Sequence, residues 1–156
     1  MSMSMHVLSD KQLNSMAEWR AAIDAEGYPL KLEDKDFHRI SGFLPAHLNG
    51  RSTGFECYHD LGEEFIRDAD DLHFDHAWQF VLSFRWRGDY DELEAAMMAG
   101  AAYATATNGI MLDDESAAFL TATEAREQMR GIGRGRPKFE AKMQELQARV
   151  LRRVEE

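Results

Sequence analysis

The segment RDADDLHFDHAWQF, residues 67–80, holds four aspartates and two histidines. Carboxylate oxygens and imidazole nitrogens are common protein ligands of divalent cations. The spacing matches neither the glycine-containing calcium loop of EF-hands nor the H-E-x-x-H zinc motif. A metal-dependent enzyme that uses the Asp68–His76 cluster, with His73, Asp75 and His76 as ligands, is therefore an alternative reading. The prediction we place ahead of this alternative is a protein that binds neither a metal ion nor another cofactor.

The acidic character extends upstream of this segment. From Glu56 to Asp75 the chain has eight acidic residues and one arginine, Arg67. Such a patch attracts and orients basic partners through complementary charge. Aromatic side chains often anchor protein interfaces. The predicted partner-binding residues are accordingly the acids and nearby aromatics Glu56, Asp60, Glu63, Glu64, Asp68, Asp70, Asp71, Asp75, Trp78, Trp86 and Tyr90.

Two other stretches contain nucleophile types. GRSTG, residues 50–54, matches G-x-S-x-G, but a proline-broken turn precedes Ser52 and the strand-like FECY follows it. A nucleophile elbow requires the reverse order, a strand and then a helix. Cys57 and His59 would share one side of a strand, yet Glu56 disfavours a thiolate. The sequence therefore predicts a binding protein rather than an enzyme.

Composition limits the class of partner. The 156 residues have a formal net charge of −10 and a single cysteine. Residues 1–130 contain 24 acidic and 11 basic side chains, whereas residues 131–156 contain 4 acidic and 7 basic ones. An acidic body repels nucleic acid, so we expect no nucleic-acid partner. No apolar run is long enough for a membrane span and no signal-peptide pattern is present, which predicts a cytoplasmic protein without a membrane partner.

Periodicity predicts an α+β fold, a mainly antiparallel sheet with helices packed on one face. Helices are expected over 9–26, from a Ser9–Gln12 capping box, over 89–108, and from a Thr121–Glu124 capping box to about 130. Strands are expected over 55–59, 78–86, 110–112 and 117–120. Residues 40–54 contain Gly42, Pro45, Asn49 and Gly50, which predicts turns with one edge strand.

The C-terminal stretch is expected to form a tethered C-terminal helix. GIGRGRP, residues 131–137, predicts a hinge between a single domain, residues 1–130, and a helix over 138–156. That helix is an extension and not a separate domain. Its apolar residues Phe139, Met143, Leu146 and Val150 follow a narrow seam. The seam would pair two copies in a homodimer, as in a structural or assembly module, or dock on its own domain.

The runs SGFLPAHLNGRSTGFECY, WQFVLSFRW and ELEAAMMAGAAYATATNGIMLDDESAAFLTATEAR, from about Phe43 to Arg126, carry a resemblance. They resemble small bacterial α+β proteins that include immunity proteins of type VI secretion and other polymorphic toxin systems. The resemblance covers a little over half of the chain and transfers no binding residue. It implies a cytoplasmic protein that neutralises a cognate toxin effector by occluding its active site. The acidic surface would then meet a basic surface of the toxin.

Overall fold

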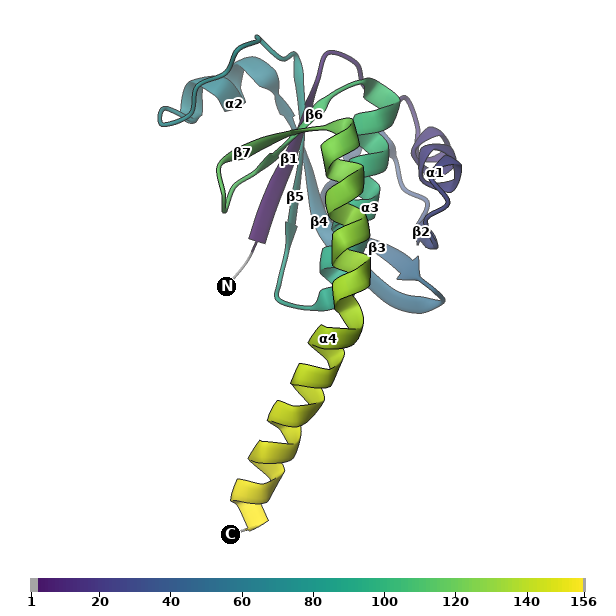
Figure 1. Ribbon diagram of the computed structural model, residues 1–156. Helices are drawn as coiled ribbons and strands as arrows, with labels where there is room; N and C mark the ends of the chain where they lie inside the picture. The colour runs from purple at the N-terminus through teal and green to yellow at the C-terminus, as the bar shows by residue number, and fades with distance from the viewer. Residues whose placement is uncertain (1–2, 156) are drawn as a thin grey trace.

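The computed structural model describes the backbone of residues 3–155 and the side chains of residues 3–136, together with Ala141, Glu145 and Ala148. Within these residues the chain forms four α-helices and one seven-stranded sheet (Figure 1). The elements are β1 (Met3–Ser9), α1 (Met16–Ala25), β2 (Leu30–Leu32), a 3-10 turn (Phe37–Arg39), β3 (Ser41–Leu48), β4 (Arg51–Leu61), α2 (Gly62–Asp68), β5 (Phe80–Trp86), α3 (Tyr90–Thr107), β6 (Ile110–Asp113), β7 (Ala118–Thr121) and α4 (Ala122–Glu155).

The sheet confirms the predicted α+β class. Its strand order is β2-β3-β4-β5-β1-β6-β7, and every neighbouring pair is antiparallel. The three longer helices, α1, α3 and α4, lie on one face, with α3 between the other two (Figure 1). The short helix α2 is the exception, because it lies on the opposite side of the sheet (Figure 1).

The inner strand β1, next to the middle strand β5, was not predicted from the sequence. β1 pairs with both β5 and β6, and its odd-numbered residues Met5 and Val7 are buried in the main core. The expected helix from Ser9 is therefore wrong at its start. Helix α1 begins after Ser15, whose hydroxyl accepts a hydrogen bond from the Glu18 amide at 3.2 Å. Ser15 and Glu18 have the same capping spacing as Ser9 and Gln12, so two equivalent signals competed.

Residues 40–54 form a long hairpin and not the predicted series of turns. β3 and β4 pair along their length, and a two-residue turn, Asn49-Gly50, connects them. Both turn residues have positive φ, 52° and 79°, as the tight turns of twisted hairpins require. Pro45 sits inside β3 without ending it. Its carbonyl accepts a hydrogen bond from the Glu33 amide at 3.0 Å.

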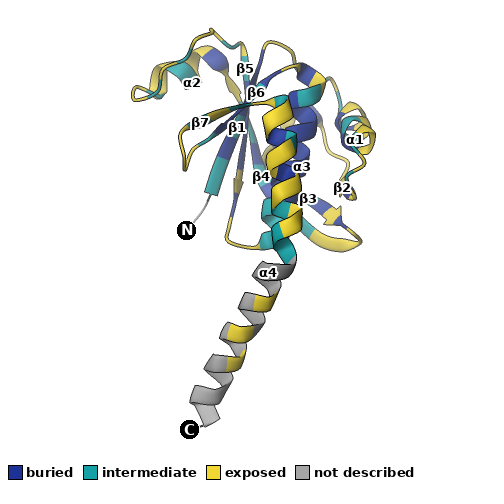
Figure 2. Ribbon diagram, viewed as in Figure 1, coloured by how far each residue is buried: buried dark blue, intermediate teal, exposed yellow. Residues whose placement is uncertain are grey.

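Helix α3 lies at the heart of the core. The helix expected over 89–108 is confirmed: the Asp89 side chain accepts a hydrogen bond from the Asp91 amide at its start, and Asn108 ends it in the left-handed conformation. Every residue from Glu94 to Ala104 is buried, because α3 packs on the sheet and is flanked by α1 and α4 (Figure 2). Small side chains allow this close packing. A β-carbon on Gly100, for example, would lie 2.5 Å from the Met5 methyl carbon.

Helix α4 corrects the expected hinge. The Thr121–Glu124 capping box is confirmed by two reciprocal hydrogen bonds of 3.1 and 3.2 Å, but the helix then continues through residues 131–137 to Glu155. Packing offsets the low helix propensity of the glycines, because Ile132 contacts the core and Arg136 forms ion pairs with α3. The side chains of the predicted seam lie outside the described residues. Among the described residues no helix is both long and apolar enough to cross a membrane.

Candidate functional site

Residues 62–79, which comprise α2 and the segment that leads to β5, cover part of the sheet face opposite α3. The inner side chains Phe65, Leu72, Phe74 and Trp78 pack on a small cluster formed by Leu8, Val81 and Leu112. The start of α2 lies close to the residues just before β5, because the Gly62 amide donates a hydrogen bond to the Gln79 carbonyl at 2.9 Å. We call residues 62–79 the α2 segment.

Gly62 is required for this close approach. A β-carbon at this position would lie 1.7 Å from the Trp78 carbonyl oxygen, which belongs to the backbone and cannot rotate away. We expect Gly62→Ala to shift the α2 segment and to cost about 1–3 kcal/mol of unfolding free energy. Urea denaturation measures the cost, with Gly88→Ala as the control, since a β-carbon there meets nothing within 4 Å. Equal stability of the two variants would contradict the packing.

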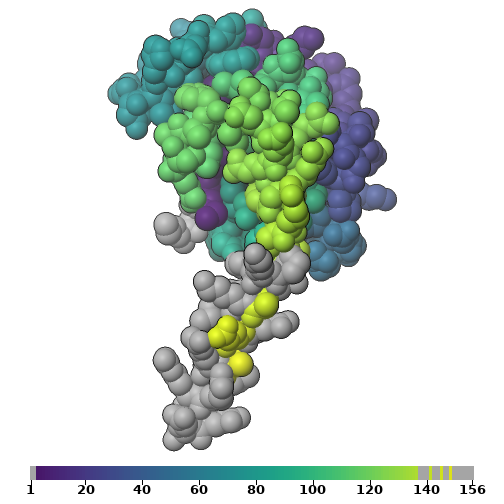
Figure 3. All heavy atoms as spheres, in the orientation of Figure 1, coloured from purple at the N-terminus to yellow at the C-terminus, as the bar shows by residue number. Residues whose placement is uncertain are grey.

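The acidic residues of the α2 segment are exposed. Their apolar neighbours pack on the sheet, whereas the acidic positions are exposed along the segment (Figure 2). In the space-filling view the segment forms a lobe at the upper left, apart from the α4 ridge (Figure 3). The exposed predicted acids are Glu63, Glu64, Asp68, Asp70, Asp71 and Asp75. The structure thus places six of the eight predicted acids on one projecting element.

A pocket lies between the α2 segment and the sheet. It has a volume of about 280 Å³, and its lining includes Asp68, Asp71, Asp114 and His6. The Asp114 carboxylate is held in place by the Ser4 hydroxyl at 2.5 Å and by His6 Nε2 at 2.7 Å. Three carboxylates line this one hollow, and carboxylates are the natural hydrogen-bond acceptors of ammonium and guanidinium groups. Asp114 lies in the turn after β6, and the pairing of β6 with β1 brings it beside Ser4 and His6.

His6 also connects this pocket to the interior of the sheet. Its Nδ1 lies 2.7 Å from Ser83 Oγ, and its ring packs on Phe65 at a centroid distance of 4.6 Å. Serine, histidine and aspartate are thereby linked in the order of a hydrolytic triad. Ser83, however, is 9% exposed in the middle of β5, with the α2 segment beside it. A substrate carbonyl cannot reach this oxygen in the observed arrangement, so we assign the linkage to holding Asp114.

No match to this chain is found among protein-family models, curated proteins or solved structures. The function must therefore be inferred from the residues themselves.

The aromatic predictions require correction. Trp86 is 6% exposed and lies under α3 and α4, so it cannot anchor a partner on the surface. Tyr90 is half-buried and its hydroxyl donates to the Ile132 carbonyl of α4. Of the three predicted aromatics only Trp78 belongs to the α2 segment, where it is half-buried beside His76. The alternation in WQFVLSFRW predicted the strand correctly from Phe80, but Trp78 precedes the strand and packs on the opposite face.

The two remaining predicted acids lie on β4. Glu56 is half-buried and accepts a hydrogen bond from the Tyr58 hydroxyl at 2.7 Å, with Arg85 opposite it on β5. Asp60 is exposed, and its carboxylate lies 3.5 Å from Ser83 Oγ. Asp60 therefore continues the acidic surface toward the pocket, whereas Glu56 belongs to a mixed-charge region further along the strand.

The runner-up metal ligands do not converge. His73 and Asp75 form an exposed ion pair at 3.1 Å, whereas His76 turns away to Asp10 at 2.6 Å. Among the described residues no group of three histidine, cysteine or carboxylate side chains is placed to hold a metal ion. Cys57 is fully buried, and burial raises the pKa of its thiol well above the ordinary value, which opposes thiolate formation. Burial also disfavours the charged form of His59 and therefore lowers the pKa of its imidazole.

Proposed function

We propose that the protein binds a cognate basic protein through the α2 segment and neutralises it by covering its active site. The observation that carries this proposal is the placement of six exposed acids on one projecting element. The acidic surface and the resemblance to immunity proteins of polymorphic toxin systems both agree with one hypothesis. In this hypothesis the protein is an immunity protein that inhibits a toxin effector. The interaction is stoichiometric and needs no cofactor.

Apolar surface beside the acids supports the same use. A shallow hollow on the outer side of the α2 segment is lined in part by Leu61, Ile66 and Trp78. Leu61 is 57% exposed and adds apolar surface to this hollow. Interfaces combine an apolar centre with a charged rim, and the rim accelerates association with an oppositely charged partner. The α2 segment offers both components.

The pocket that contains Asp68, Asp71 and Asp114 supplies a specific contact. A lysine or arginine of the partner would enter it and meet the Asp114 carboxylate, which Ser4 and His6 already hold in position. A preorganised acceptor avoids part of the entropy cost of binding. Once the partner covers the pocket the pair is buried, and truncating one member of a buried, hydrogen-bonded charge pair commonly costs about 2–5 kcal/mol.

Charge reversal tests the proposal. We expect Asp68→Lys, Asp70→Lys and Asp71→Lys, made together, to weaken partner binding by at least about a hundredfold without lowering the melting temperature by more than a few degrees. The measurement is affinity capture from an extract of the source organism, followed by titration calorimetry with the captured protein. Growth rescue on co-expression of that protein tests neutralisation.

A matched control makes the result specific. Asp24→Lys, Glu33→Lys and Glu127→Lys change the net charge equally, and all three residues are exposed on other elements. This control should bind like the unmodified protein. Loss of binding in both variants would show a general charge effect, and retention in both would overturn the interface. A captured protein that co-expression does not detoxify would overturn neutralisation and leave the interface intact.

A further inference from the structure

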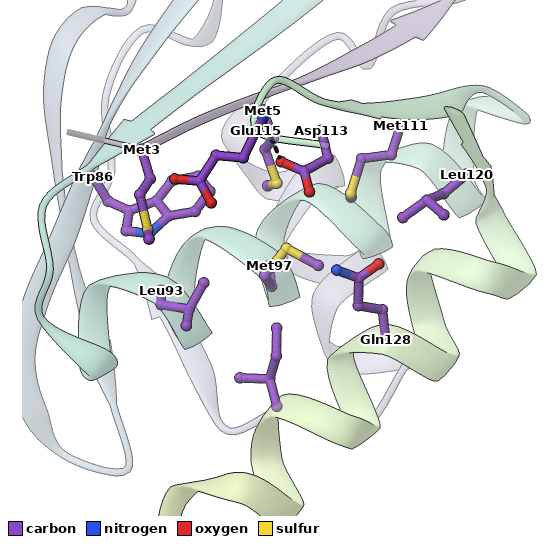
Figure 4. A pocket seen from close by; sticks show the side chains of 11 residues that line it. Met3, Met5, Trp86, Leu93, Met97, Met111, Asp113, Glu115, Leu120 and Gln128 are labelled. Atoms are coloured by element: carbon purple, nitrogen blue, oxygen red, sulfur yellow. Dashed lines mark hydrogen bonds between the residues drawn. The ribbon is translucent and has the colours of Figure 1, made fainter. Parts of the chain in front are cut away.

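A second hollow lies on the other side of the sheet, between β1, β5, β6, α3 and α4. It is a cavity of about 230 Å³ that is lined mostly by apolar side chains. Four of them are the methionines Met3, Met5, Met97 and Met111. In the close view Trp86 lies at one end of the cavity, and Leu120 and Gln128 lie at the other (Figure 4). Methionine side chains are flexible and polarisable, so such a wall adapts to differently shaped ligands.

The Trp86 indole N–H needs a hydrogen-bond acceptor in the cavity. Its indole nitrogen is buried and, among the described residues, has no hydrogen-bond partner. The nitrogen is on the side of the ring that faces Met3 and Leu93, both of which line the cavity (Figure 4). A buried donor without an acceptor carries a desolvation cost of about 1–3 kcal/mol, so native proteins rarely leave one unused. An acceptor atom on a bound molecule would satisfy it.

The acidic residues at the rim of the cavity disfavour negatively charged ligands. Asp113 and Glu115, at the turn after β6, are the charged residues that line it. Asp113 is oriented by the Ser116 hydroxyl at 3.0 Å and the Glu115 amide at 3.1 Å. Carboxylates at the rim repel an anionic ligand and tolerate a neutral one. The site is therefore unsuited to a fatty acid, although its apolar lining suits an aliphatic chain.

We propose that this cavity is a binding site for a neutral, mainly aliphatic small molecule whose oxygen accepts the hydrogen bond of Trp86 Nε1. Benzene fills an apolar cavity of about 150 Å³. By the same scale a cavity of about 230 Å³ holds on the order of nine non-hydrogen atoms. A medium-chain alcohol has this size and this chemistry. The cavity and the α2 segment lie on opposite faces of the sheet, and they share only the turn in which Asp114 stands between the rim residues Asp113 and Glu115.

The experiment titrates 1-octanol into the ¹⁵N-labelled full chain and follows the indole N–H resonances. The chain has three tryptophans. The Trp19 indole already donates to the Ala99 carbonyl at 3.0 Å, and Trp78 lies on the other face, so both act as internal references. We expect a saturable shift of the Trp86 resonance alone, and octanoate should bind at least about tenfold more weakly.

Two variants locate the site. Trp86→Phe keeps the aromatic wall and removes the donor, and it should weaken octanol binding about five- to tenfold as judged by calorimetry. Gly100→Ala adds a methyl group 2.5 Å from the Met5 methyl carbon and 3.1 Å from that of Met111, which must then move into the cavity. It should abolish binding, while the higher helix propensity of alanine offsets part of the cost of displacing the methionines.

Three results would overturn the proposal. They are the lack of a saturable Trp86 shift in the folded protein, equal binding of octanol and octanoate, and undiminished octanol binding by Gly100→Ala. None of them bears on the α2 segment, because partner capture and octanol titration use different faces of the molecule. A failure of the partner-binding proposal therefore leaves this inference standing, and the reverse also holds.

Discussion

Replacing Trp19 by alanine should remove about 3–5 kcal/mol of unfolding free energy, the range measured for large aromatic truncations in cores. Trp19 is fully buried and is the largest of the fully buried side chains. Its ring makes edge contacts with Phe37, Phe84 and Tyr103 at centroid distances of 5.7, 6.1 and 5.5 Å. It therefore joins α1 to α3, the sheet and the 3-10 turn, and alanine would leave a cavity between all of them.

The conservative change separates volume from hydrogen bonding. Trp19→Phe keeps most of the aromatic contact and loses the bond from Nε1 to the Ala99 carbonyl. We expect it to cost about 1–2 kcal/mol, clearly less than alanine. Urea denaturation followed by circular dichroism measures both values. A loss below about 1 kcal/mol for Trp19→Ala would mean that α1 is not seated on the core as described.

The sequence predicts well those elements whose signals are local. The caps of α3 and α4 and the β6–β7 hairpin depend on residues within a few positions of one another, and each was located correctly. β1 could not be recognised in this way. Met3 to Ser9 is short and mixed in polarity, and it becomes a central strand only because β5 and β6 pair with it from distant parts of the chain. Its alternation of Met3, Met5 and Val7 was the available signal.

The same distinction applies to the sites. Exposed acids of the α2 segment could be predicted because their density lies in one stretch of sequence. The Asp114 pocket and the Trp86 cavity could not, because their walls are assembled from β1, β5, β6 and the helices. Trp86 is an example. An aromatic residue at the end of a strand is predicted to be exposed at an interface, and only the positions of α3 and α4 show that it is covered.

The predicted hinge at residues 131–137 was wrong because contacts with distant residues, which the local sequence does not show, keep this segment helical. Glycines lower helix propensity, but a charge cluster holds this part of α4 against α3. Arg136 Nη1 donates to Glu94 Oε1 at 2.7 Å, and its other terminal nitrogen reaches Asp91. Asp91 also binds Arg51 of β4 at 3.0 Å. The hydrogen bond from Arg51, aided by Arg136, holds the pKa of Asp91 below its ordinary value.

The Glu94–Arg136 pair should therefore decide whether α4 stays docked. The Glu94 side chain is 6% exposed, so Arg136→Met leaves a buried carboxylate without that guanidinium. We expect a loss of about 3 kcal/mol, with faster hydrogen exchange of the α4 amides before residue 136. The double change Glu94→Met with Arg136→Met removes both charges and should lie within about 1 kcal/mol of the unmodified protein.

Comparing these variants by urea denaturation separates two explanations of the continuous helix. If the ion pair positions α4, the single change is much worse than the double one, and Arg134→Met, a change at an exposed arginine two residues earlier, stays within about 0.5 kcal/mol of the unmodified protein. If all three variants behave alike, the charges contribute little, and Met129 and Ile132 alone seat the helix. The first outcome would explain why a glycine-rich segment is helical, since the buried Glu94 carboxylate on α3 is paired with a guanidinium that α4 supplies.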